Sequence, residues 1–221
     1  MVRADPEAWR DAIMSLIPSV PTDEYLDSLE WGLIAVLRAS PDRRATEAVL
    51  ARRAHADRTV ASVVGNALSF GGRGIGELHA LEVLGEAFVF NTWSRYQRNY
   101  RTRGGGSPPP DVAVDYWAWQ LMEGLVYSDP DATWRLFLRY LEQENDPDLR
   151  AAAGIGWLES INFRHAAEFI DRIETEARTN ERLRAVMRGM YPPSEDVDIG
   201  RRFRTAANEP TDDDASEPGM T

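Results

Sequence analysis

Apolar residues recur every three or four positions along most of this chain. The first such stripe comprises Trp9, Ile13, Leu16 and Ile17, and later stripes lie within residues 26–37, 134–141, 149–161 and 166–177. This spacing places the apolar side chains on one face of a helix. No alternating stretch long enough for a strand interrupts the pattern. The sequence therefore predicts an all-α fold.

Proline between two capping residues marks the start of several predicted helices. The three segments with this pattern are Ser40-Pro41-Asp42, Asp129-Pro130-Asp131 and Asp146-Pro147-Asp148. A Ser or Asp side chain can accept hydrogen bonds from the first free N–H groups of a helix, and proline fits the first helical position. We therefore expect Ser40, Asp129 and Asp146 to be N-caps.

Two changes in composition divide the predicted helices. Residues 101–110 contain three glycines and three prolines, which cannot continue a helix, so we expect a linker there. Residues 194–221 contain eight acidic residues and three arginines, which favours disorder. The predicted organisation is an N-terminal helical half (1–100), the linker (101–110), a C-terminal helical half (111–193) and an acidic disordered tail (194–221).

The two predicted halves share a weak internal similarity. A shift of 89 residues places Pro41-Asp42 on Pro130-Asp131 and Gly65 on Gly154. One interpretation is two HEAT-like four-helix halves built of stacked antiparallel helices, an architecture that commonly presents a binding surface. The other is a chance match. Whether the halves form one core or two lobes stays open.

The composition excludes several classes of chemistry. All 25 basic residues are arginine, and cysteine is absent, which removes lysine catalysis, disulfides, thiolate nucleophiles and cysteine-bound zinc. The net charge of −11 argues against nucleic acid and anionic membrane surfaces as partners. No apolar run approaches the length of a membrane span, and the first residues lack the pattern of a signal peptide. We expect a cytoplasmic protein without a cofactor.

Two histidine–glutamate pairs are the strongest candidates for a metal site. His79 and Glu82, like His165 and Glu168, are separated by three residues, so each pair shares one helix face. Inward-facing Glu and His side chains hold metals in some helical bundles, although those motifs place glutamate first. The alternative is that all four residues cap helices or pack.

A second candidate is the arginine-rich segment that precedes the predicted linker. Arg95, Arg98, Arg101 and Arg103 are interleaved with aromatic residues, and no acidic residue lies between them. Such a segment can grip phosphates while its aromatic rings stack on bases. The alternatives are that these arginines complement the C-terminal dipole of a helix or bind an acidic protein segment.

Three motifs stand out within residues 119–191. They are Asp129-Pro130-Asp131, Gly156-Trp157-Leu158-Glu159 and the run from Phe169 to Ala177. With these motifs the segment resembles an uncharacterised bacterial family of small α-helical domains of unknown function. The family has Gly-Pro-Leu-Glu where this chain has Gly156-Trp157-Leu158-Glu159. The resemblance implies a helical domain and assigns no activity or catalytic residue.

These observations predict a binding protein more than an enzyme. We expect a non-enzymatic helical interaction module of unknown oligomeric state, whose partner is another protein. The acidic balance favours a basic partner, as for an immunity protein or an adaptor, because complementary charge speeds encounter. The alternative is a metal-dependent or hydrolytic helical enzyme that uses the His79 and His165 faces.

Overall fold

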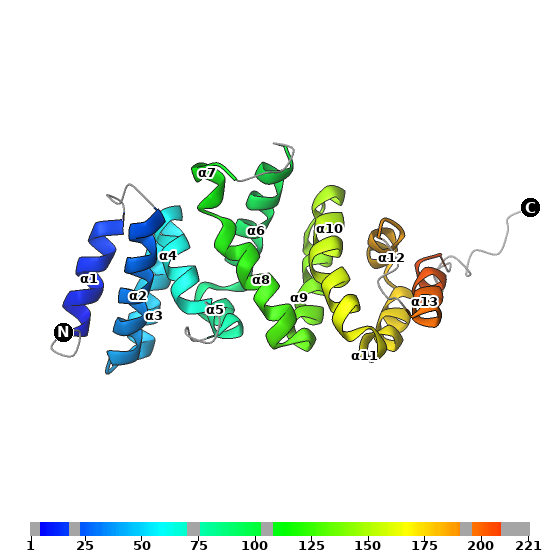
Figure 1. The fold of residues 1–221 in the computed structure, drawn as a ribbon, viewed down its shortest axis with the longest axis horizontal. Coiled ribbons are helices and arrows are strands. Elements are labelled where there is room, and N and C mark those ends of the chain that lie inside the picture. Colours follow the sequence, from blue (N-terminus) through cyan, green and yellow to red (C-terminus); the bar gives the residue numbers. More distant parts are fainter. Residues whose placement is uncertain (1–4, 18–22, 70–75, 103–107, 191–195, 209–221) are drawn as a thin grey trace, which may run out of the picture. The chain divides into compact units, whose positions relative to one another are not determined.

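The structure is a computed structural model that describes residues 5–17, 23–69, 76–102, 108–190 and 196–208. Every regular element in these residues is a helix, which confirms the all-α prediction. The helices, which Figure 1 labels in chain order, belong to two compact units, residues 1–125 and 126–221. The unit boundary falls inside a helix and not at the predicted linker. The two units therefore differ from the four-helix halves that the sequence predicted.

The described residues of the first unit form seven helices and the greater part of an eighth. They are α1 (Pro6–Leu16), α2 (Asp23–Ala39), α3 (Arg43–Ala56), α4 (Arg58–Ser69), α5 (Glu77–Leu84), α6 (Glu86–Arg101), α7 (Pro110–Ala113) and α8 (Tyr116–Ser128). Helix α4 packs against α2, α3 and α5, and its fully buried Val63, Val64 and Leu68 explain this central place. At the joint between α5 and α6, Gly85 has a φ of 85°, a conformation that other residues rarely adopt.

The second unit begins in the last turn of α8 and contains α9 (Pro130–Gln143), α10 (Pro147–Ala153), a π-helical turn η2 (Gly154–Leu158), α11 (Glu159–Ala177), α12 (Glu181–Arg188) and α13 (Val197–Asn208). Aromatic rings form much of its core. Trp157 lies edge-on to Phe137 and Tyr140, and all three side chains are buried. Helices α11, α12 and α13 pack against one another.

The predicted helix starts are mostly confirmed. Asp129 caps α9 and Asp146 caps α10, and each is followed by proline at the first helical position. The prediction for Ser40 is wrong, because Asp42 caps α3 by accepting a hydrogen bond from the Ala45 N–H. Here the proline precedes the cap instead of following it.

The prediction of disorder from residue 194 onward is wrong for residues 197–208, which form α13. The segment is polar overall, but its few apolar side chains share one helix face. Phe203, Ala206 and Ala207 are buried, and Arg202 joins α13 to Glu174 of α11 at 2.7 Å. Composition failed here because one buried ring and an ion pair suffice to dock a short helix. Residues 209–221 lie outside the described part of the chain.

Candidate functional site

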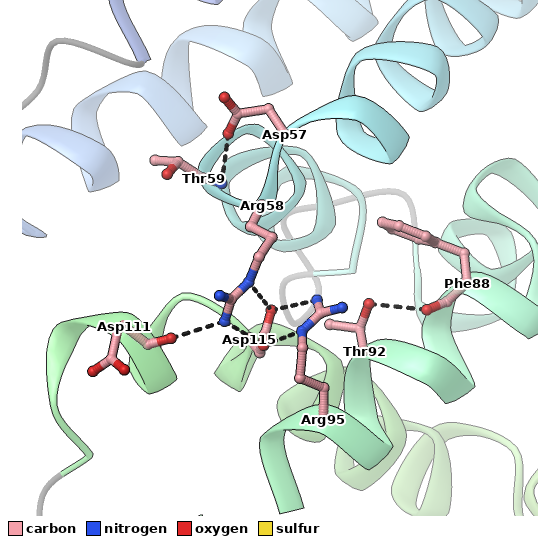
Figure 2. A network of polar contacts seen from close by, with 8 residues as sticks. All are labelled: Asp57, Arg58, Thr59, Phe88, Thr92, Arg95, Asp111 and Asp115. Carbon is pink, nitrogen blue, oxygen red and sulfur yellow. Dashed lines mark hydrogen bonds and ion pairs between the residues drawn. The ribbon is translucent and has the colours of Figure 1, made fainter. Parts of the chain in front are cut away.

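An ion cluster in the first unit contains Arg95, one of the four predicted binding arginines. Its Nε and Nη2 atoms donate to both carboxylate oxygens of Asp115 at 2.6 and 2.7 Å. Arg58 approaches the same carboxylate, with Nη2 at 2.7 Å, and also donates to the backbone carbonyl of Asp111 (Figure 2). The cluster therefore joins the start of α4, the middle of α6 and the turn between α7 and α8.

The electrostatics of this cluster suit a structural role. Asp115 is only 1% exposed, whereas the side chains of Arg58 and Arg95 are 45% and 37% exposed. The hydrogen bond to Asp115 raises the pKa of the Arg95 guanidinium, and the nearby negative charge raises it further. Two guanidiniums share one carboxylate, and both oxygens of Asp115 accept hydrogen bonds. The clear role of the cluster is to hold α8 against α4 and α6.

The other predicted arginines have different surroundings. Arg98 and Arg101 are exposed in the last turn of α6, where positive charge complements the helix dipole. Arg103 lies outside the described residues. Their role in binding another molecule stays a prediction.

The His79 pair has a third member that the sequence did not indicate. His79 Nε2 lies 2.8 Å from Glu47 of α3, while its Nδ1 lies 3.5 Å from the exposed Glu82. Burial disfavours the charged form of Glu47, but hydrogen bonds from His79 and Arg43 outweigh this effect and lower the pKa of the Glu47 carboxyl. Glu47 is therefore held as a carboxylate that ties α3 to α5.

The His165 pair is a local contact in the second unit. His165 Nδ1 lies 3.5 Å from the exposed Glu168, and the ring lies edge-on to Phe169. The backbone of His165 departs from helical geometry, with φ at −130° and ψ at 23°, which kinks α11. Across the described ranges, no group of three or more His, Asp or Glu side chains is arranged to hold a metal ion.

An exposed aromatic surface lies just before this kink. The guanidinium of Arg164 stacks on the Tyr127 ring, 3.8 Å from its centroid, and donates to the Tyr127 hydroxyl. Phe163, the neighbour of Arg164 on α11, is 75% exposed, and Tyr127 is 55% exposed. We call Tyr127, Phe163 and Arg164 the aromatic surface.

Sequence reasoning missed the residues that complete these sites. Arg58 and Asp115 are 57 positions apart, and Tyr127 and Arg164 are 37 apart. Local spacing contains no signal for such pairs. The local signal that could have drawn attention to the aromatic surface is an aromatic residue beside an arginine, Phe163-Arg164.

A comparison with known families confirms the resemblance and extends it. A family of unknown function (DUF6869) matches residues 108–211. Neither curated proteins nor solved structures give a match. No helix in the described residues is both long and apolar enough to cross a membrane.

Proposed function

We propose that this chain is a non-enzymatic helical module that binds another protein through the aromatic surface of its second unit. The observation that carries the proposal is Phe163, a large apolar side chain left three-quarters exposed one residue before Arg164, whose guanidinium stacks on Tyr127. Folding leaves this ring in water, whereas a partner could bury it. The aromatic surface lies within the family match, residues 108–211.

The chemistry of the aromatic surface supports a role in protein binding. Tyrosine and arginine are enriched among residues that dominate binding energy, and phenylalanine is enriched in interface cores. Stacking on Tyr127 already holds the Arg164 guanidinium in place. A partner that contacts this ordered arginine therefore loses less side-chain entropy than one that must order it.

The acidic balance of the second unit favours a basic partner with an exposed apolar residue. On α11, Glu168 and Asp171 are exposed, as is Asp131 on α9. Asp171 pairs with Arg202 and Asp131 with Arg172, so part of this acidic surface is already neutralised. Residues 126–221 contain 20 acidic residues and 12 arginines. An apolar side chain of the partner would cover Phe163, and basic residues of the partner would face the acidic surface of the unit.

Photo-crosslinking from position 163 tests the proposal directly. Replacing Phe163 with the photoreactive analogue p-benzoylphenylalanine should yield one covalent partner protein in the native host, identified by mass spectrometry. The same analogue at Trp9, an exposed tryptophan of the first unit, is the matched control and should not yield that product.

A binding titration with the purified partner then measures how much the aromatic residues and the charges contribute to the affinity. Phe163→Ser together with Tyr127→Ser should weaken binding by about tenfold or more, since anchor residues contribute about 2 kcal/mol or more. Trp9→Ser should leave the affinity unchanged. Equal binding of all three proteins would refute the aromatic surface, and affinity that is insensitive to salt would refute a basic partner.

The enzyme alternative rests on two histidine–glutamate pairs. Its four residues, His79, Glu82, His165 and Glu168, form two local pairs, and the third group near His79 is the buried Glu47. No specific observation favours a reaction at either pair.

A further inference from the structure

Helix α3 in the first unit faces solvent with an unusual excess of arginine. It contains Arg43, Arg44, Arg52 and Arg53 and a single acidic residue, Glu47. Glu47 is buried and accepts from both Arg43 and His79. The one carboxylate of α3 is therefore used inside the unit, while all four arginines are exposed.

The flanking acidic residues are engaged as caps. Asp42 accepts from the N–H of Ala45 at the start of α3, and Asp57 accepts from the N–H groups of Thr59 and Val60 at the start of α4. Arg44 and Arg52 make no hydrogen bond or ion pair within the described part of the chain. Two exposed guanidiniums on α3 are thus available to an external anion.

The geometry of the two arginines defines what they can bind. They are eight residues apart, so they share a side of α3 and lie about 12 Å apart along its axis. The exposed residues between and beside them include Ala45, Ala48 and Ala56, whose small side chains let another backbone approach closely. We call Arg44, Arg52 and these alanines the arginine face.

We propose that the arginine face binds an acidic segment of a protein partner, whose carboxylates pair with Arg44 and Arg52. A planar guanidinium matches a carboxylate in a two-pronged hydrogen bond, which gives both affinity and orientation. Carboxylates spaced two helical turns apart on a partner helix would match the 12 Å interval. The arginine face consists of other residues than the aromatic surface, and it prefers a partner segment of the opposite charge. This proposal is therefore independent of the proposed function.

The same observations disfavour nucleic acid at this face. Single-stranded nucleic acid binds where aromatic side chains form stacking platforms, and the arginine face has none. The nearby His55 ring is itself stacked on Phe88, with centroids 4.2 Å apart. Residues 1–125 contain 16 acidic residues and 13 arginines, so no broad positive field surrounds the face.

The test uses the full chain and a synthetic acidic peptide. The probe is a labelled alanine-based helix of about 15 residues with glutamate at every fourth position, and its control has glutamine instead. Fluorescence anisotropy should show binding of the glutamate peptide and not of the glutamine peptide. Arg44→Gln with Arg52→Gln should weaken binding by about tenfold, the effect of losing two ion pairs.

A matched variant controls for total charge. Arg135→Gln with Arg204→Gln removes two exposed arginines of the second unit and should leave the affinity within about twofold. Phe163→Ser should also leave it unchanged, so a failure of this proposal is distinguishable from a failure of the aromatic surface. Circular dichroism verifies that each variant is folded.

Three outcomes would overturn the proposal. They are no binding of the glutamate peptide at millimolar concentration, equal binding to the Arg44→Gln/Arg52→Gln variant, and displacement of the peptide by a single-stranded RNA of about 20 nucleotides that binds at least about tenfold tighter. The last result would assign the face to nucleic acid instead.

Discussion

Gly65 of α4 lies directly against the indole of Trp117 on α8. A Cβ atom at position 65 would lie less than 3 Å from three atoms of that ring. Both residues are buried, and the ring is too large to move aside without disturbing its neighbours. The missing side chain of Gly65 is therefore what lets α8 approach α4.

Gly65→Ala should destabilise the first unit. We expect a loss of about 1–3 kcal/mol in the free energy of unfolding, the usual cost of overpacking a core. Urea unfolding followed by tryptophan fluorescence measures it. At Gly156, by contrast, an added Cβ meets nothing within 4 Å, so Gly156→Ala should be neutral or stabilise by up to about 1 kcal/mol.

Asp115→Asn should loosen the contacts of α8 with α4 and α6. The change removes the buried charge that both Arg58 and Arg95 approach, and we expect a loss of about 2 kcal/mol. Asp198→Asn serves as the control, because the Asp198–Arg201 pair is exposed on both sides and should contribute less than about 0.5 kcal/mol. Equal effects in urea unfolding would show that the cluster does not stabilise the fold.

Glu47→Gln should reveal a pH-dependent part of the stability. The folded protein lowers the pKa of the Glu47 carboxyl below its usual 4.5, so its stabilisation is present at neutral pH and is lost as the pH falls through the folded value. The variant should be about 1–2 kcal/mol less stable than the parent at pH 7. Urea unfolding between pH 7 and about pH 3 should show this difference shrinking. A difference in stability that stays constant with pH would contradict the prediction. The control is Glu82→Gln, which changes an exposed glutamate.

Arg182→Lys should destabilise the second unit even though charge is kept. Arg182 Nη1 lies within 3.2 Å of the carbonyl oxygens of Leu141, Glu142 and Glu144 at the C-terminal end of α9. Lysine has a single side-chain nitrogen, so it would lose the contact that Arg182 Nη2 makes with Asn145 Oδ1 at 3.3 Å, and a loss of about 1 kcal/mol is expected. Thermal unfolding measures it, with Arg135→Lys as the exposed control.

Phe203→Ala tests whether α13 belongs to the folded unit. Phe203 is fully buried, and removing its ring should cost about 3–5 kcal/mol. Hydrogen exchange of the α11 and α12 amides should accelerate together with that of α13. Arg204→Ala, on the exposed side of the same helix, should change stability by less than about 0.5 kcal/mol. If the two variants behaved alike, residues 197–208 would be part of the disordered tail that the composition predicted.

Local signals in the sequence were sufficient for the helices. The capping roles of Asp129 and Asp146 follow from the residues next to them, because a cap and its N–H groups are three residues apart or fewer. Ser40 was a poorer prediction because Pro41 permitted two cap positions, and the backbone adopted the one at Asp42. Short-range patterns locate a helix start better than they choose between adjacent caps.

The sequence by itself determined that this protein is helical, where most of its helices begin and which chemistries it lacks, because those properties depend on neighbouring residues and on composition. Tertiary structure alone decided that Arg95 shares Asp115 with Arg58, that His79 contacts Glu47, and that Phe163 stays exposed while Phe203 is buried. Each of these outcomes depends on which helix packs against which. That choice comes from the summed burial and close fit of side chains many residues apart, so it has no counterpart in local spacing.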